Sequence, residues 1–332
     1  SGILNSVHTF ANDPERGLFI LIFLFFLIFI SLFIFFFFHK TNQNTSNNFF
    51  WLSKETSIII NNWFMMYFLS VVLIGTVYPI FLDVLSSQKI SVGPPFYHKL
   101  IIPFLIPFLI AMTIGPKLKW IKSNLKDKLY LVSLLVLSIL LSLFIVKKFD
   151  TNFLINTILI SSALYLFLTT FRDFFIKKYN NISQNVAHFG FSLLILSILF
   201  NNLFSTEIIT NLKVGETYDS PETKIVFESI DQKQKKNYKS VVANFSVKRS
   251  NGIVENLSPE LRIYNQPNIV TSEADIKTSL ISDKFIVINI VKNQDYFNVR
   301  YQVKPFMLWI WMSVLLISFA GFMSLFRKEY EK

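Results

Sequence analysis

The chain has 332 residues, of which 52% are hydrophobic; it contains 38 Phe and no Cys, and its formal net charge is +11. The lack of cysteine excludes disulfides, zinc-thiolate sites and cysteine nucleophiles. Several charge-free runs of about 20 residues exclude a soluble globular domain. Because lipid cannot satisfy backbone polar groups, each run must be helical, and the sequence predicts an α-helical polytopic membrane protein.

The apolar runs predict about seven membrane-spanning helices. The third is short and carries Pro103 and Pro107, which predicts a kinked or irregular segment. The predicted spans are residues 18–38, 58–83, 100–115, 129–146, 153–171, 183–204 and 305–326.

A small β-rich domain is predicted between the last two spans. Apolar residues alternate with polar ones in 241–247 and again in 297–303, as in half-buried strands. Asn251-Gly252 predicts a hairpin turn. The predicted organisation is an external segment at 1–17, a six-helix membrane region at 18–204, an extracytoplasmic β-rich domain at 205–303, and a last helix with a short basic cytoplasmic tail at 304–332.

Basic residues are divided unequally between the short loops, with thirteen Lys and Arg on one side and five on the other. The richer side is expected to be the cytoplasm or the matrix, so the β-rich domain and the segment with His8 should lie outside. The net charge then follows from the topology, and we expect no nucleic-acid partner.

His188 is the strongest candidate for chemistry. It lies about 7–8 Å inside the sixth predicted span and shares a helix face with Gln184 and Ser192. An ionisable residue in a span is a functional candidate, and imidazole is a haem-iron ligand. On chemistry alone, a histidine hydrogen-bonded between helices is an equal alternative. A bis-histidine site would need its second ligand from another chain.

The other candidates are weaker. His8 lies in a polar segment and is, by itself, typical of a solvated loop; His39 is interfacial, and His98 is typical of a helix start. The loop 89–97 predicts either a rigid external ledge or a simple turn before a helix. Asn61-Asn62 could hydrogen-bond across helices. Segment 258–264 predicts either a binding surface or a strand-edge salt bridge.

The chain resembles, nearly end to end, the C-terminal half of the CcmF family of cytochrome c haem lyases. Each matching segment is weak by itself, whereas their order and spacing together are specific. The segments are 1–4, 6–11, 13–17, Ser53-Lys54-Glu55, Asn61-Asn62, 75–79, 90–95, Gly115-Pro116 with Trp120, Ala187-His188-Phe189-Gly190, Pro259-Glu260, Arg262, Tyr264, Glu273-Ala274, Asp283, and 303–306 with Trp309-Ile310-Trp311.

The resemblance implies that the chain helps to attach haem covalently to the thiols of apocytochrome c. His8 matches the second of two external histidines that flank the substrate haem, which implies a catalytic, iron-ligating role. His188 matches the second of two transmembrane histidines that hold haem b. The first histidine of each pair and a Trp-rich motif have no counterpart here, so we expect a natural split subunit or a fragment that is incomplete alone.

The resemblance also implies partners and a location. The partners are an N-terminal half with the Trp-rich motif, a CcmE-type haem chaperone, apocytochrome c with CcmH-type thiol-reducing or chaperone subunits, and membrane lipid; quinol is left open as an electron source. The location is the bacterial inner membrane with a periplasmic β-domain, or the mitochondrial inner membrane. The alternatives are a non-catalytic scaffold of the maturation complex and, less favoured, a haem transporter, because no inverted repeat is visible.

Overall fold

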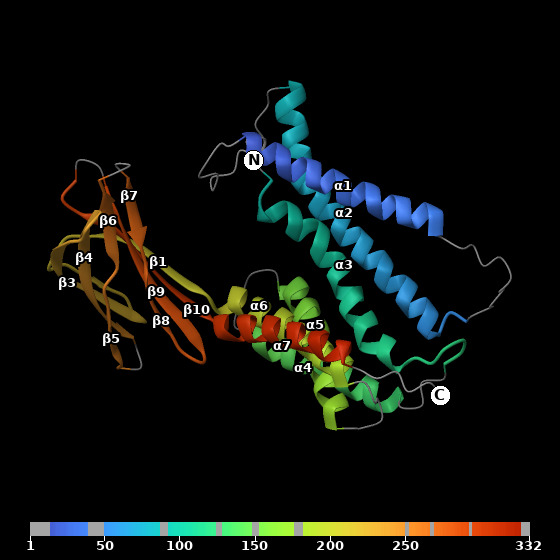
Figure 1. The fold of residues 1–332 in the computed structure, drawn as a ribbon. Coiled ribbons are helices and arrows are strands. Elements are labelled where there is room, and N and C mark those ends of the chain that lie inside the picture. Colours follow the sequence, from blue (N-terminus) through green and yellow to red (C-terminus); the bar gives the residue numbers. More distant parts are fainter. Residues whose placement is uncertain are drawn as a thin grey trace. The chain divides into compact units, whose positions relative to one another are not determined.

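A computed structural model gives the fold of the chain (Figure 1). It describes residues 14–38, 50–86, 92–123, 128–147, 153–175, 182–249, 252–265, 269–291 and 294–326. The chain divides into two compact units. One comprises residues 1–139 and 149–162, and the other comprises residues 140–148 and 163–332.

Helices coincide with all seven predicted spans. Among the described residues, six helices are long and apolar enough to cross a membrane, and the first contributes a shorter apolar stretch, Ile22–Phe38. The prediction of a polytopic helical membrane protein is therefore confirmed. The helices are α1 Pro14–Phe38, α2 Lys54–Ser86, α3 Pro94–Ile114, α4 Lys128–Val146, α5 Phe153–Phe175, α6 Ile182–Phe204 and α7 Met307–Leu325, with a short 3-10 helix, η1, at Gly115–Lys117.

The early starts of α2 and α3, relative to the predicted spans, have local causes. The hydroxyl of Ser53 accepts the backbone N–H of Thr56 at 3.3 Å, which caps the first turn of α2. α3 starts at Pro94, where a proline ring fits because the first helical N–H needs no partner. α3 is longer than the predicted third span, and it continues without a break through its two internal prolines.

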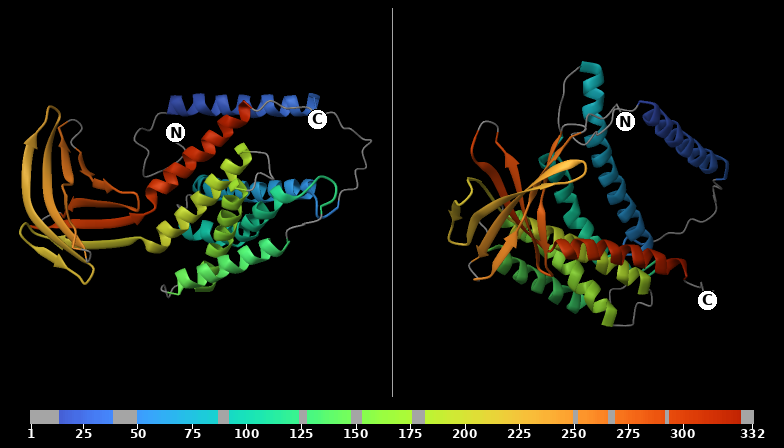
Figure 2. Two further views of the ribbon diagram at one scale, coloured as in Figure 1. Left: turned by 90° about the horizontal axis from the view of Figure 1, so that it is seen from below. Right: turned by 60° about the vertical axis from the view of Figure 1, so that its left-hand side comes forward.

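The region between α6 and α7 forms two antiparallel sheets that face each other (Figure 2). One sheet has the strand order β1-β10-β9-β8, and the other has β2-β3-β4-β6-β7, with β5 paired to β4. The strands are β1 Thr206–Leu212, β2 Thr217–Asp219, β3 Thr223–Gln234, β4 Tyr238–Arg249, β5 Val254–Leu257, β6 Glu260–Tyr264, β7 Val270–Glu273, β8 Asp275–Thr278, β9 Ser282–Ile290 and β10 Phe297–Pro305.

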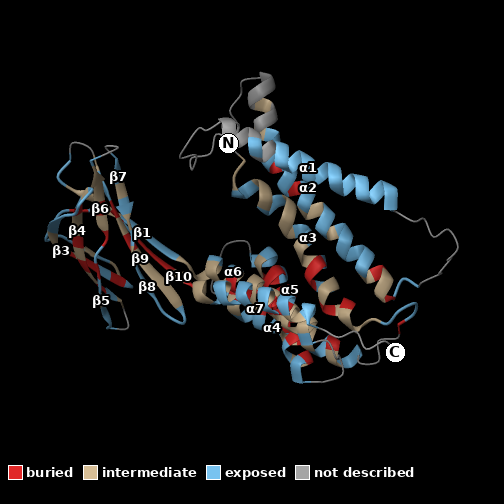
Figure 3. Cartoon of the chain, in the orientation of Figure 1, coloured by how far each residue is buried: buried red, intermediate tan, exposed pale blue. Residues whose placement is uncertain are grey.

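The core of this sandwich follows the predicted alternation. Ala243, Phe245 and Val247 of β4 are buried, and Val299 and Tyr301 of β10 meet them from the other sheet (Figure 3). The outward residues between them are polar, so each strand has one apolar and one polar face. The predicted β-rich domain before the last helix is confirmed.

The predicted hairpin also has structural support. β4 and β5 pair antiparallel, with Lys248 opposite Val254. Gly252 has φ +79°, a backbone conformation that favours glycine, and its N–H donates to the carbonyl of Arg249 at 2.9 Å. Asn251, the other residue of the predicted turn, lies outside the described residues.

Candidate functional site

The helix that carries His188 is the centre of the candidate site. His188 lies six residues beyond Ile182, the first residue of α6, which is about 9 Å along the helix axis. Its side chain is half-buried, as is that of Gln184, whereas Ser192 on the same face is fully buried. The polar face predicted from the sequence therefore becomes more buried with distance from the start of α6.

α5 covers this side of α6. The ring of Phe189, next to His188, lies 5.4 Å from Phe167 and 5.3 Å from Phe174, centroid to centroid, and Phe171 is 6.3 Å away. Deeper in the helix, the Ser192 hydroxyl donates to the carbonyl of Phe189 at 2.8 Å. Aromatic contacts thus hold α6 and α5 together beside the imidazole.

A buried hydrogen-bond pair strengthens this contact. The hydroxyls of Ser192 and Thr170 lie 3.3 Å apart, and both side chains are buried. Inside a membrane, where no water is available, Ser and Thr hydroxyls form their hydrogen bonds within or between helices. The pair fixes the rotation of α6 four residues, about one turn, beyond His188.

α7 packs on another side of α6, at Gly190. A Cβ at Gly190 would lie 2.9 Å from a side-chain carbon of Ile317 and 3.2 Å from the carbonyl oxygen of Ser313. Only glycine allows the two helices to approach so closely. His188 is two residues earlier, about 200° around the helix, so it lies away from the contact with α7.

This arrangement offers one imidazole rather than a complete metal site. Among the described residues, no group of three or more His, Cys, Asp or Glu side chains is placed to hold a metal ion. A half-buried imidazole on a helix fixed by two neighbours is chemically able to bind a haem iron. The described residues therefore fit a single iron-binding imidazole at His188 and do not by themselves make a complete haem site.

The remaining histidines are not brought to this site by the described structure. His8, the predicted external ligand, lies outside the described residues, and so does His39. His98 is exposed in the first turns of α3, next to the exposed Lys99. The helix that begins at Pro94 agrees with the simpler alternative for the loop 89–97, a turn leading into a helix.

In the other compact unit, several of the segments that resemble the family contact one another. There the start of α2 contacts η1 and the residues that follow η1. Both carboxylate oxygens of Glu55 accept the backbone N–H of Ile121, at 2.9 and 3.0 Å. Lys54 lies over the ring of Trp120, with its ammonium 5.0 Å from the centroid. Ile121 has φ +65°, and this uncommon conformation for a β-branched residue is held by these bonds.

A second meeting joins α2 to the start of α3. A Cβ at Gly75 would lie 2.7–2.9 Å from ring and hydroxyl atoms of Tyr97, so only glycine permits this approach. About two turns towards the start of α2, the Tyr67 hydroxyl donates to the carbonyl of Leu100 at 3.0 Å. These contacts give Gly75 and Tyr97 a packing role.

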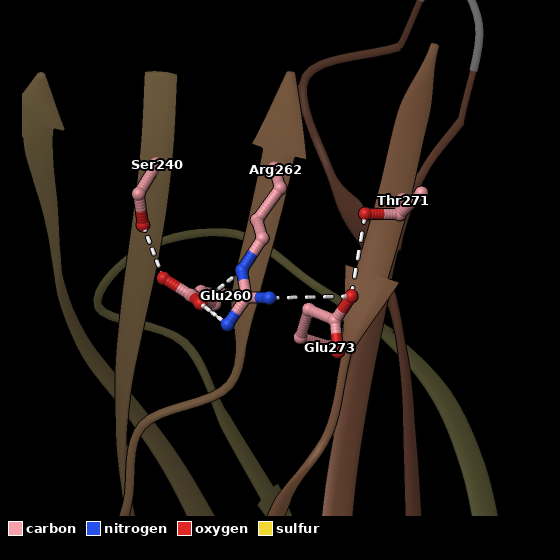
Figure 4. A network of polar contacts seen from close by, with 5 residues as sticks. All are labelled: Ser240, Glu260, Arg262, Thr271 and Glu273. Atoms are coloured by element: carbon pink, nitrogen blue, oxygen red, sulfur yellow. Dashed lines mark hydrogen bonds and ion pairs between the residues drawn. The ribbon is translucent and has the colours of Figure 1, made fainter. Parts of the chain in front are cut away.

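Segment 258–264 forms a polar network on the outer face of the sandwich (Figure 4). Glu260 binds Ser240 and Arg262, and Arg262 lies 3.7 Å from Glu273. The Ser240 hydrogen bond, and then Arg262, hold the pKa of Glu260 below its usual value despite some burial. β6 lies between β4 and β7, so this salt bridge is inside the sheet rather than at the predicted edge.

Sequence reasoning missed the residues of α5 and α7 that contact the helix of His188. The spacing of Phe167, Phe171 and Phe174 along one side of α5 was available as a signal, but the abundance of Phe obscured it. The role of Gly190 depends on α7, more than a hundred residues later, and no local pattern reveals it. The left-handed conformation of Ile121 has no sequence signal, because β-branched residues avoid it.

Comparison with known proteins identifies the sandwich. Residues 203–305 match a family model described as the CcmF C-terminal beta-sandwich. A solved structure named cytochrome c heme lyase CcmF is similar to the chain, with a TM-score of 0.67 and 19% sequence identity; the match covers 84% of this chain and 46% of that one. At this identity the match supports the fold.

Similarity to curated proteins extends over the whole chain. The chain is 30% identical to the cytochrome c-type biogenesis protein CcmF of Pseudomonas fluorescens, over 99% of this chain and 52% of that protein. It is 28% identical to CcmF of Escherichia coli (strain K12), over 100% of this chain and 53% of that protein. The chain spans about half the length of these relatives. Its sandwich matches the CcmF C-terminal beta-sandwich model, and the chain as a whole is similar to about half the length of these cytochrome c-type biogenesis proteins named CcmF.

Proposed function

We propose that this chain forms the sandwich-bearing part of a cytochrome c haem lyase and helps to attach haem to apocytochrome c. The observation that carries the proposal is the similarity to CcmF proteins across 99% of the chain. Six membrane-capable helices and a sandwich joined to α6 and α7 agree with it. The chain has no cysteine, so in this proposal both reacting thiols belong to the substrate.

The proposed reaction is an addition. Each thiol sulfur bonds to one carbon of a haem vinyl group, and the thiol proton goes to the neighbouring carbon, so the organic groups gain and lose no electrons overall. His8 would bind the iron of the substrate haem outside the membrane and so hold the vinyl groups in one orientation. Restricting two reactants in this way lowers the entropic barrier of a bimolecular step.

His188 would help to hold a resident haem b within the membrane, with its imidazole binding the iron. When bound, such a haem provides one-electron transfer. The contacts of Phe189 and Ser192 with α5, and of Gly190 with α7, would orient the imidazole and hold its position. The second histidine would come from the N-terminal half of the lyase, which also carries the Trp-rich motif.

The exposed surface of α2 supports such a partner. Asn61 and Asn62 are exposed seven and eight residues beyond Lys54, about 11 Å along a membrane-capable helix. Amide side chains in hydrocarbon are unfavourable unless they are hydrogen-bonded. A helix of the N-terminal half would satisfy them. A CcmE-type haem chaperone and CcmH-type subunits would deliver haem and the reduced apocytochrome on the sandwich side.

We place the chain in the bacterial inner membrane with the sandwich in the periplasm. The excess of Lys and Arg in the loops of the opposite side supports this orientation. The same orientation in a mitochondrial inner membrane is the alternative.

The test is co-expression of this chain with an N-terminal half in cells that lack their own lyase. We expect covalent holocytochrome c to form, and His8→Ala to abolish it. His98→Ala is the matched control, because His98 is exposed at a helix start. A normal yield with His8→Ala would remove His8 from the mechanism. Full maturation by a complex that never contains haem would favour the scaffold, and haem flux into vesicles without apocytochrome would favour the transporter.

A further inference from the structure

The loop between β8 and β9 carries two large apolar residues that the described structure leaves uncovered. This β8–β9 tip, residues 278–282, contains Leu280 and Ile281, each 71% exposed. The other three residues are small and hydroxylic, and the tip has no charge. Exposed aliphatic pairs at a loop tip are unfavourable in water and favourable at a lipid interface.

Hydrogen bonds within the tip keep its polar groups satisfied. The Ser279 hydroxyl donates to the carbonyl of Ser282 at 2.7 Å and accepts the Ser282 N–H at 3.1 Å. The backbone N–H of Ser279 also donates to the Ser282 carbonyl, at 3.2 Å. The turn can therefore lie against apolar material without breaking these bonds.

The tip is fastened to the beginning of α7. The indole N–H of Trp309 donates to the carbonyl of Leu280 at 2.8 Å, and the backbone N–H of Phe306 donates to that of Ile281, also at 2.8 Å. Phe306 has φ +61°, an uncommon left-handed conformation that turns the chain from β10 into α7. The junction between β10 and α7 thus holds the β8–β9 tip beside the first turn of α7.

The length of α7 determines where the β8–β9 tip lies relative to the membrane. α7 has 19 residues, so it measures about 28 Å, close to the roughly 30 Å thickness of a hydrocarbon core. The whole helix is needed to cross, and its first turn must therefore lie at the membrane–water boundary. Trp309 and Trp311 near its start are typical of that boundary. The β8–β9 tip, hydrogen-bonded to Trp309, must lie at the same depth.

We infer that the β8–β9 tip is a membrane anchor, with Leu280 and Ile281 inserted between the lipid headgroups and the first acyl carbons on the sandwich side. The sandwich is already joined to α6 and α7 at this end (Figure 2). There the side-chain amide of Asn201 donates to the carbonyl of Pro305 at 2.6 Å. The tip would add a third attachment and hold the sandwich at a fixed tilt to the bilayer.

The absence of native cysteine allows a direct test in the full chain, reconstituted in phosphatidylcholine–phosphatidylglycerol vesicles. A fluorophore is attached to Leu280→Cys or, as matched control, to Ile290→Cys, which is 52% exposed at the other end of β9. The tip is held by backbone carbonyls and serine hydroxyls, so neither substitution removes a bond that forms it.

We expect a spin-labelled lipid with its nitroxide near the headgroup to quench the Leu280 probe several-fold more than the Ile290 probe. Iodide in the water should show the opposite order. Equal quenching of the two probes would overturn the inference. Protection of the Leu280 probe from both lipid and iodide would overturn it too, because it would mean that protein covers the tip.

Discussion

The sandwich and the helices bury their residues in different ways. In the sandwich, Ile225 and Phe227 are fully buried between two sheets of the same chain, and Glu207 on the outer face is bound by Arg300 and Gln302. In the helices, long stretches are exposed (Figure 3). Residues 22–38 of α1 are all exposed, and so are Asn61 and Asn62 of α2. The core of the sandwich is completed by its own residues, whereas the helices need lipid and, in our account, another polypeptide.

The largest effect on stability should come from a substitution in the buried core of the sandwich. Phe227 and Phe245 stack at 4.4 Å between centroids, and both are almost fully buried. Phe227→Ala should lower the free energy of unfolding of the sandwich by about 3–5 kcal/mol, because the cavity is only partly refilled. The measurement is the denaturant concentration at which the sandwich of the full chain becomes protease-sensitive. Ile290→Ala, at an exposed site, should change it little; equal shifts would contradict the core assignment.

A smaller effect should follow from separating α6 and α7. Gly190→Leu places atoms where Ile317 and the Ser313 carbonyl already lie, so the helices must move apart, at a cost of about 1–3 kcal/mol. Gly321→Leu is the control, because a Cβ there meets no described atom within 4 Å. The melting temperature measured in detergent should fall for Gly190→Leu only. Equal melting temperatures for the two variants would show that Gly190 does not set the helix contact.

The proposed contact between the exposed helices and another polypeptide is tested at the amides of Asn61 and Asn62 in α2. Asn61→Leu combined with Asn62→Leu should weaken association with the N-terminal half by about 1–2 kcal/mol, the usual strength of such bonds in membranes. Met66→Leu, 61% exposed on the same helix, is the control. Co-purification of the two polypeptides is the measurement. Undiminished recovery with the double variant would indicate that lipid or water, rather than a partner, meets these amides.

The smallest expected effect is a pH dependence in the sandwich. Ser240 first, and Arg262 second, lower the pKa of Glu260 in the folded chain below the unfolded value of about 4.3. A lowered pKa stabilises the fold above the unfolded pKa, and this contribution is lost as pH falls through the folded pKa. Glu260→Gln should therefore flatten the fall in stability below about pH 4.3, by less than about 1 kcal/mol because the pair is partly exposed. A pH profile identical to that of the unchanged chain would contradict this.

The two regions also differ in how much of them the sequence predicts. Alternation in β4 and β10 correctly gave the buried faces, since a half-buried strand repeats every two residues. Uninterrupted hydrophobic runs predicted where the helices lie in the sequence. They predicted neither where each helix ends nor which helices pack together, because a lipid-facing helix has no polar stripe that marks its orientation. The contacts of His188's neighbours with α5 and α7 depend on residues distant in sequence, so only the structure revealed them.

The central claim of our proposal is that the imidazole of His188 would bind the iron of a haem shared with another polypeptide. The most direct measurement is the reduced-minus-oxidised absorbance spectrum of the purified two-polypeptide complex, normalised to protein. The account predicts that His188→Ala removes the b-type signal while the two polypeptides still co-purify, and that His98→Ala retains the signal. An unchanged b-type spectrum in His188→Ala would contradict the claim.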